Sequence, residues 1–274
     1  MQLKALLGDY PVTHALKSGE VRSPEVSFDF ADVKLPQQAF KRVVRDLDFD
    51  VAELALVTYL LAKAHGKPYR LLPAVLTARF QHPYLVCLKK NSYAPQDLKG
   101  KRIGQRSYSV TTAAWIRGML IDEGVDLSGI QWVTFEEPHV AEFRDPPNVQ
   151  RAPAGKEMIE MLLAGEIDAA IAGEIPKDER IVPIYRDPAA AAREWREKHG
   201  AIQINHMVVV RSQMAPATSG EIFHLLSESR KAAGNPDMNP FGLEANRRNL
   251  EVAIDCVYRQ GMIPRRFEVE ELLR

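Results

Sequence analysis

The most informative stretch of this sequence is DLKGKRIGQRSYSVTTAAWIRGML, residues 97–120. A turn at Leu98-Lys99-Gly100 leads into a short predicted strand at residues 101–104, and a loop rich in hydroxyl groups then runs directly into a predicted amphipathic helix. Backbone N–H groups at the start of a helix lack partners within it and carry the positive end of its dipole. Such a helix start can hold a small anion, typically a carboxylate or a phosphate.

Hydroxyl side chains surround this predicted helix start, and no carboxylate lies among them. We therefore expect a small-molecule anion site here, with these candidate binding residues: Tyr108, Ser109, Thr111 and Thr112. The alternative is structural, with Ser109 or Ser107 capping the helix by accepting a hydrogen bond from one of its first N–H groups. On this segment alone both interpretations stay open.

Strand and helix patterns alternate along nearly the whole chain, which indicates an α/β architecture. Predicted strands lie at residues 3–7, 25–30, 50–55, 69–76, 84–89, 101–104, 130–135, 167–172, 181–185 and 201–211. Predicted helices lie at residues 13–17, 37–45, 58–64, 157–163 and 188–199 and over most of the remaining C-terminal part. The stretch 136–155 is the loosest part of the sequence and is interpreted as a mobile loop.

Two long apolar segments, around residues 69–89 and 201–211, bracket a self-contained α/β block. This is the pattern of a chain that crosses from one lobe to another and later returns. We therefore predict a discontinuous first lobe, residues 1–83 plus 204–274, and an inserted second lobe, residues 84–203. A cleft between two lobes is a favoured site for a small ligand.

The composition argues against several classes of partner. Lys plus Arg and Asp plus Glu are balanced at 36 each, so nothing indicates a nucleic acid or an acidic membrane surface. Cys87 and Cys256 lie alone in apolar runs, outside any metal or redox spacing, and are interpreted as buried inert thiols. The N-terminal segment has no secretory signal pattern, and no apolar run approaches a membrane span. We expect a cytoplasmic protein, provided that no leader has been removed.

Ionisable side chains interrupt the apolar pattern near the predicted crossings. Arg79 and His82 follow the long predicted strand; a guanidinium there can grip a carboxylate, and an imidazole can exchange a proton near neutral pH. The alternative is a surface arginine and a histidine packed at the hinge before Pro83. His206 lies on the returning crossing, either as a core histidine or as a general acid. Glu53 interrupts the apolar run DVAELAL, where burial favours a protonated carboxyl group usable as a general acid, or an ion pair with an arginine.

Further polar residues are candidates for ligand contact. Asp9 and Tyr10 end the first predicted strand, where loops of an open α/β sheet gather around ligands, although Asp9 can equally cap the next helix. Thr58 begins a predicted helix and supplies a second anion-facing helix start. Trp115 and Arg117 are expected to be structural, with Trp115 packed and Arg117 facing solvent. No role is assigned to the remaining histidines, which show no mutual spacing: His14, His65, His139, His199 and His224.

No organic cofactor is expected, because no G-x-G-x-x-G motif follows the first strand and no P-loop occurs. A divalent metal stays open, since Glu53, His82 and His206 could converge as two histidines and a carboxylate. No local ligand spacing supports such a site, so we expect none.

Several motifs together carry a family resemblance. They are Gly8-Asp9-Tyr10 with Thr13 and Ala15-Leu16, residues 49–53, 79–82 and 97–104, Tyr108 with residues 111–118, and residues 163–169, 205–210, 241–246, 260–261 and 270–272. The motifs DLKGKRIG (97–104) and LAGEIDA (163–169) resemble type II periplasmic-binding-protein folds, which are two-lobed, hinge-closing binders of small solutes. Within that superfamily the chain is similar, over nearly its whole length, to the group called 4,5-dihydroxyphthalate decarboxylase-like.

The resemblance implies non-oxidative decarboxylation of a hydroxylated aromatic carboxylate in the interlobe cleft. Such a reaction needs a general acid, for which His82, His206 and Glu53 are candidates, and a clamp for carboxylates, here Arg79 with the helix start at residues 109–112. One alternative is a binding protein that closes on a small carboxylate solute without chemistry. Another is a biosynthetic enzyme on a related branch of the fold. The oligomeric state stays open.

Some positions depart from the family pattern. Pro11-Val12 stands where an Asp-Arg pair is usual, and His14 stands where another arginine is usual. The second-lobe turn at residues 172–176 is also less basic than in the family. Fewer cations at the cleft mouth favour a ligand with less negative charge than a phthalate, such as a monocarboxylate or another aromatic acid.

Overall fold

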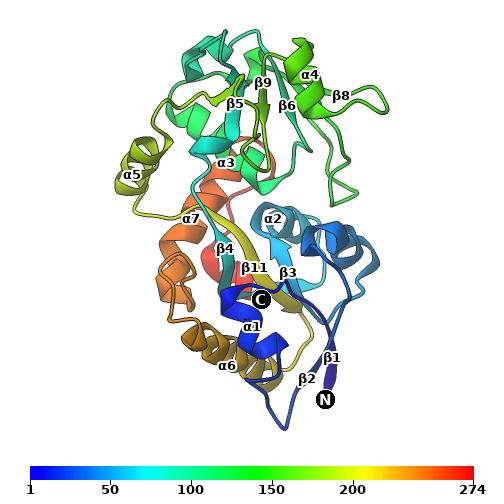
Figure 1. Cartoon of the computed structure of the whole chain (residues 1–274). Coiled ribbons are helices and arrows are strands. Elements are labelled where there is room, and N and C mark those ends of the chain that lie inside the picture. The colour runs from blue at the N-terminus through cyan, green and yellow to red at the C-terminus, as the bar shows by residue number, and fades with distance from the viewer.

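The computed structural model describes residues 1–274, and its strands form two separate sheets (Figure 1). The first sheet has the order β2-β1-β3-β11-β4, in which β1 pairs in parallel with β2 and β3, and β11 pairs antiparallel with β3 and β4. Its strands are β1 (Gln2–Leu6), β2 (Ser27–Phe30), β3 (Val51–Ala55), β4 (Tyr69–Ala78) and β11 (Ile204–Arg211). We call this sheet and its flanking helices the first lobe.

The second sheet is built entirely from the chain between β4 and β11. Its order is β10-β5-β9-β6-β7-β8, with parallel pairing from β9 to β8 and antiparallel pairing of β5 with both β9 and β10. Its strands are β5 (Leu85–Leu88), β6 (Arg102–Gln105), β7 (Gln131–Thr134), β8 (Val149–Arg151), β9 (Ala169–Ile171) and β10 (Ile181–Pro183). β8 lies inside the predicted loop 136–155, so part of that segment is an edge strand. This sheet and its helices form the second lobe.

Most predicted helices are present. They are α1 (Pro11–Lys17), α2 (Leu56–Ala64), α3 (Thr111–Asp122), α4 (Met158–Ala164), α5 (Pro188–His199), α6 (Pro216–Ala232) and α7 (Leu243–Arg259). The prediction of an α-helix at residues 37–45 is wrong. The helix is replaced by a 3₁₀ turn, η1 (Pro36–Ala39), and a π-helical turn, η2 (Arg42–Asp46), which ends at Leu47 in the left-handed conformation (φ 57°).

The chain crosses between the lobes twice, after β4 and before β11, and the two crossings are bonded to each other. The Arg79 N–H donates to the Gln203 carbonyl over 3.2 Å, and the Gln81 N–H donates to Gln203 Oε1 over 2.6 Å. Gln81 Nε2 also donates to Asn205 Oδ1 over 3.0 Å. The predicted two-lobed α/β fold is therefore confirmed, while boundaries at 83/84 and 203/204 stay predictions.

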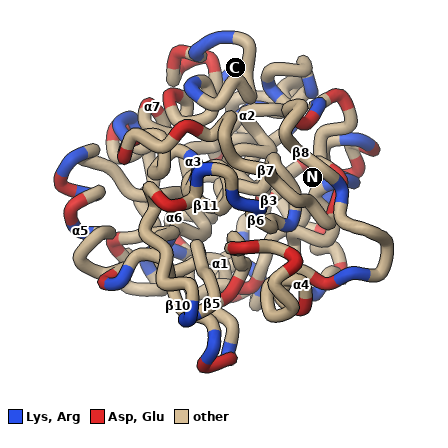
Figure 2. The backbone as a smooth tube through the Cα atoms, turned by 90° about the horizontal axis from the view of Figure 1, so that it is seen from above, with Lys and Arg blue, Asp and Glu red and all other residues tan.

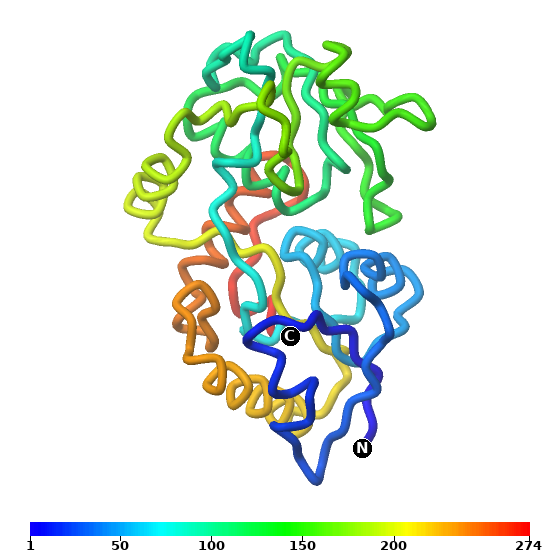
Figure 3. The backbone as a smooth tube through the Cα atoms, in the orientation of Figure 1, coloured from blue at the N-terminus to red at the C-terminus, as the bar shows by residue number.

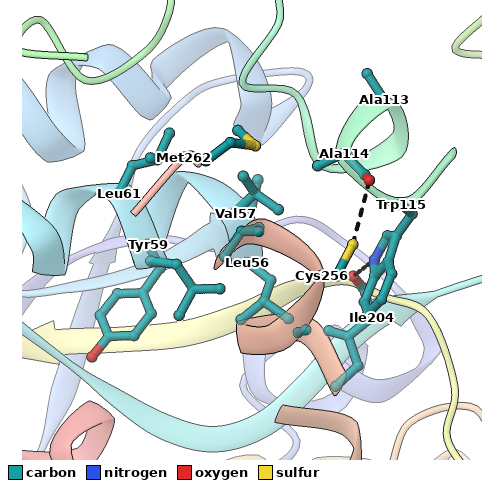
Figure 4. Close-up of a cluster of buried hydrophobic side chains, with 14 of the residues drawn as sticks. Leu56, Val57, Tyr59, Leu61, Ala113, Ala114, Trp115, Ile204, Cys256 and Met262 are labelled. Carbon is teal, nitrogen blue, oxygen red and sulfur yellow. Dashed lines mark hydrogen bonds between the residues drawn. The ribbon is translucent and has the colours of Figure 1, made fainter. Parts of the chain in front are cut away.

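The hydrophobic core does not stop at the lobe boundary. One cluster of 53 buried apolar residues draws on both sheets, and α7 packs against α3 of the second lobe (Figure 4). At this contact the Cys256 thiol donates to the Ala114 carbonyl over 3.4 Å, and the neighbouring Trp115 of α3 donates from Nε1 to the Ile204 carbonyl of β11 over 2.9 Å. A Cβ at Gly118 would lie 2.4 Å from Cys256 Sγ, so α3 and α7 can approach this closely only with glycine there.

Arg117 was expected to face solvent, and that prediction is wrong. The side chain is completely buried and donates to Gln105 Oε1 (2.6 Å), Gln260 Oε1 (2.8 Å) and the Tyr108 carbonyl (2.7 Å). Its guanidinium also lies 3.7 Å from the centroid of the Tyr108 ring. The helix that carries it, α3, is buried on nearly all sides, whereas the sequence predicts an amphipathic helix with one exposed side.

Charged segments of both signs are interspersed around the outline of the molecule, and neither sign gathers in one region in the view from above (Figure 2). No helix combines the length and the apolar character that crossing a bilayer requires.

Arg117→Ala should destabilise the fold by about 3 kcal/mol or more, because it leaves two buried acceptors, on Gln105 and Tyr108, and one half-buried acceptor, on Gln260, without their donor. The measurement is the free energy of unfolding in urea. Arg193→Ala is the matched control, since the Arg193 side chain is exposed on α5 and makes no hydrogen bond. A loss for Arg117→Ala no larger than that of the control would contradict this account of the core.

Candidate active site

A cleft of about 670 Å³ lies between the two lobes, a volume suited to a small organic ligand. Both lobes contribute to its wall. Its polar and aromatic lining includes Tyr10, Phe40, Arg79, Asn205 and His206 from the first lobe and the crossings, and Arg106, Thr111, Thr112, Glu136 and His139 from the second.

The predicted site residues fall into three groups. Those that line the cleft are Tyr10, Arg79, Thr111, Thr112 and His206. Those that lie behind the lining, in hydrogen-bond contact with a lining residue, are Glu53 and Thr58. Those that do not line the cleft are Asp9, His82, Tyr108 and Ser109.

The Glu53 carboxylate has no exposed surface and is held by three donors. Its Oε1 lies 2.5 Å from His206 Nδ1 and accepts the Tyr10 hydroxyl over 2.7 Å, and its Oε2 accepts the Gly8 N–H over 2.9 Å. The side-chain partners of Glu53 are thus a histidine and a tyrosine, and not the arginine considered above. The arrangement orients the His206 imidazole, with Nδ1 toward the carboxylate and Nε2 left without a protein partner.

The local sequence explains how Glu53, Tyr10 and His206 are brought together. The pairing of β11 with β4 is irregular on both sides of His206, and such bulges redirect side chains. A Cβ at Gly8 would lie 2.5 Å from the Tyr10 ring, so glycine lets that ring fold back toward Glu53. Thr13 fastens the turn, since its Oγ1 donates to the Gly8 carbonyl (2.7 Å) and accepts the Tyr10 N–H (2.9 Å). Burial and the Glu53 charge raise the pKa of Tyr10 well above its usual range, which keeps this hydroxyl a donor.

Two helix starts meet at the cleft, and in neither does the residue that precedes the helix cap it with its side chain. Ala55 precedes α2 and Val110 precedes α3, while the Val57 N–H donates across to Thr111 Oγ1 over 3.2 Å. The first intrahelical bond of α3 is donated by Ala114, so earlier N–H groups at Thr111 and Thr112 remain free for a ligand. The serine cap considered above does not form, because no serine hydroxyl accepts a hydrogen bond from the start of α3; the Ser107 and Ser109 hydroxyls are buried and lie 3.3 Å from each other.

Two guanidinium groups line the cleft. Arg79 forms no salt bridge in the protein; its Nη2 donates to the Gly173 carbonyl of the second lobe (2.8 Å), and its Cζ lies 3.9 Å from the centroid of the Tyr84 ring. Arg106 lies 3.7 Å from the Glu136 carboxylate and is partly neutralised by it. Arg79 is therefore the cation most available to a carboxylate ligand.

His139 lines the cleft although no role was assigned to it. Its Nδ1 lies 2.9 Å from Thr58 Oγ1, and its ring meets the Phe40 ring edge-on at 5.6 Å. Burial, with the nearby cations Arg106, Lys41 and Arg45, lowers the pKa of His139 to about 3. Thr58 precedes it by 81 positions, so no local spacing could have revealed this contact.

The other predicted residues outside the lining have different surroundings. His82 begins the 3₁₀ turn η3 (His82–Tyr84), is buried against the Tyr185 ring at 5.1 Å, and so packs at the hinge. Asp9 is exposed and lies 3.0 Å from His14, and Tyr108 is buried beneath Arg117. The metal grouping of Glu53, His82 and His206 does not form, and no cluster of three or more His, Cys, Asp or Glu side chains is placed to hold an ion.

Burial lowers the pKa of His82 from 6.5 to about 4, which links its environment to stability. Between these values the unfolded chain binds a proton that the folded chain does not, so stability falls as the pH falls, by up to about 1.4 kcal/mol per pH unit. His82→Gln should flatten this slope between pH 6.5 and pH 4 in urea unfolding experiments. Values at pH 8, where this imidazole is neutral in both states, supply the baseline, and an unchanged slope would refute the assignment.

No protein-family model matches the chain, but curated sequences do. It is 32% identical over 251 residues to 4,5-dihydroxyphthalate decarboxylase of Comamonas testosteroni, covering 85% of this chain and 76% of that protein. It is 31% identical over 210 residues to 4,5-dihydroxyphthalate decarboxylase of Pseudomonas putida, covering 71% of this chain and 81% of that protein.

Solved structures share the fold at low sequence identity. The periplasmic aliphatic sulphonate-binding protein SsuA of Escherichia coli has a TM-score of 0.60 at 13% identity, covering 99% of this chain and 97% of that one. The desulfurization enzyme DSZB has a TM-score of 0.53 at 14% identity, covering 99% and 95%. A binding protein and an enzyme thus share this architecture, so the fold by itself does not choose between them.

Proposed function

The chain belongs to the 4,5-dihydroxyphthalate decarboxylase family of carboxy-lyases, and from that premise we propose that it decarboxylates a hydroxylated aromatic carboxylate without oxidation in the interlobe cleft. The observation that carries this proposal is the buried Glu53 carboxylate 2.5 Å from Nδ1 of His206, a histidine on the cleft wall. A carboxylate in that position stabilises an imidazolium and fixes its orientation. His206 is therefore the proposed general acid, and Glu53 its positioning partner.

The proposed reaction balances with one proton and no oxidant. His206 donates a proton from Nε2 to the ring carbon that bears the carboxylate, and a ring π pair forms the new C–H bond. A lone pair of the ring hydroxyl, ortho or para to that carbon, delocalises the positive charge. The C–C bond to the carboxylate then breaks, its electron pair restores the aromatic ring, and carbon dioxide leaves. His206 recovers its proton from water.

The clamp for the substrate is proposed to combine Arg79, which follows the strand paired with that of His206, and the start of α3 in the second lobe. Arg79 and the free N–H groups of Thr111 and Thr112 can bind carboxylate oxygens, while the Phe40 ring supplies an apolar wall for the aromatic ring. Carboxylates of Glu136, Glu157 and Glu174 also line the cleft and disfavour a second negative charge. A substrate with a single carboxylate fits this balance better than a phthalate dianion.

The second candidate is a non-catalytic binding protein for a small carboxylate, a function compatible with the fold shared with SsuA. Binding alone does not require an imidazole backed by a buried carboxylate. His82 has no part in either proposal, because it does not line the cleft.

The direct test incubates the protein with hydroxylated benzoates and phthalates, including 4,5-dihydroxyphthalate, and follows carbon dioxide release. His206→Gln should lower kcat by about 10²–10⁴-fold, because the proton donor is lost. His224→Gln, an exposed position on α6, is the control and should keep full activity. Thermal stabilisation by a carboxylate without any product would support the binding protein instead.

Glu53→Gln should lower kcat more than it changes KM, by about 10²–10⁴-fold, because the neutral amide no longer stabilises the imidazolium. Tyr10→Phe removes only one of the donors to Glu53 and should have a smaller effect. Melting temperatures of both variants separate loss of catalysis from loss of the fold. If Glu53→Gln retained the kcat of the unmodified enzyme, His206 would act without its carboxylate and the assignment of Glu53 would fail.

A further inference from the structure

His139 is a second imidazole on the wall of the cleft. We infer that it contacts the substrate, its Nε2–H donating a hydrogen bond to an oxygen of the substrate carboxylate. The inference rests on the proposed function, since it names a further group that recognises the same class of substrate. It concerns recognition of the carboxylate, whereas His206 is proposed to transfer the proton.

The position of His139 depends on both lobes. It is carried by the second-lobe segment 136–145 between β7 and β8, which descends toward α2 and the turns at residues 36–46 (Figure 3). Arg45 of the first lobe anchors this segment, donating from Nη2 to the Pro138 carbonyl (2.6 Å) and from Nε to the His139 carbonyl (2.8 Å). The segment that the sequence indicated as mobile is therefore tied down at His139.

Both imidazoles contact the same aromatic ring. Phe40 meets His139 edge-on with centroids 5.6 Å apart and meets His206 edge-on with centroids 5.2 Å apart. All three residues line the cleft. A ligand that contacts Phe40 in the cleft would therefore lie near both imidazoles.

The hydrogen bond to Thr58 determines which nitrogen of His139 carries the proton. The Thr58 side chain is buried, and its hydroxyl has no hydrogen-bond partner other than His139 Nδ1, at 2.9 Å. A buried hydroxyl left without an acceptor is costly, so Thr58 donates to Nδ1. In a neutral imidazole the proton then sits on Nε2. That nitrogen has no partner in the protein and is not among the fully buried unpaired atoms.

The charges around His139 explain why it suits recognition and not proton transfer. With its pKa lowered to about 3 by burial, Arg106, Lys41, Arg45 and His206, the imidazole stays neutral near neutral pH. A neutral N–H can hold a carboxylate oxygen but has no proton to give to a ring carbon. Donation to the ring hydroxyl would instead withdraw the electron pair that protonation of the ring requires, so the carboxylate is the consistent partner.

Two substitutions separate this role from a structural one. In His139→Gln the amide nitrogen can reach the place of Nε2, whereas in His139→Asn the amide reaches only the place of Nδ1, next to Thr58. We expect His139→Asn to weaken binding of the carboxylate by about 10–100-fold, as for a lost hydrogen bond to a charged group. His139→Gln should stay within about fivefold of the unmodified protein. The effect should fall mainly on KM, with kcat changed less.

The probes are 4-hydroxybenzoate for turnover and benzoate, which lacks the activating hydroxyl, for binding by calorimetry. Weaker benzoate binding by His139→Asn, restored in His139→Gln, supports the inference even if no carbon dioxide is released and the proposed function fails. Equal losses in both variants would overturn it, because the loss would then not depend on a donor at the position of Nε2. No loss in either variant would also overturn it, because the carboxylate would then bind without His139. If neither carboxylate binds the unmodified protein, the inference fails together with the proposed function.

Discussion

The Glu53 carboxylate is the interaction on which the wall of the cleft depends. A fully buried carboxylate is costly unless donors surround it, and here the donors come from the turn after β1 and from β11. Satisfying this one group brings Tyr10 across the end of the first sheet and directs His206 toward the cleft. The glycine at position 8 and the irregular pairing around His206 are the local features that make this geometry possible.

The cleft is a product of both lobes, and its geometry follows from how they are joined. The two crossings are bonded to each other through Gln81 and Gln203, while a continuous core links α3 with α7. On the opposite side, Arg45 holds the segment that delivers His139. The residues proposed for catalysis and for recognition therefore come from elements that no single lobe contains. A change in the relative position of the lobes would alter the distances from the second-lobe residues Thr111 and Thr112 to Arg79 and His206.

Most of the fold could be predicted because the spacing of apolar residues along a helix or strand indicates which of its side chains are buried. The apolar runs of β4 and β11 and the helix at residues 188–199 have patterns that tertiary contacts did not override. The pattern of apolar and polar residues gave wrong predictions at two places, where the tertiary environment differs from that usual for such a pattern. Residues 37–45 contain helical spacing but form 3₁₀ and π turns, and Arg117 is enclosed by α7 and the second sheet although it is charged. Spacing along one segment carries no information on what packs against its polar side.

The sequence by itself determined the two-lobed α/β fold, the family and a set of ionisable candidates that includes Glu53, Arg79 and His206. Only the tertiary structure decided how these candidates are paired. It joined Glu53 to His206 across 153 positions, packed His82 against Tyr185 instead of the cleft, and placed His139 beside Thr58. The physical reason is that the alternation of apolar and polar residues encodes which side chains are buried. Which donor satisfies which buried acceptor depends on contacts through space between segments distant in the chain.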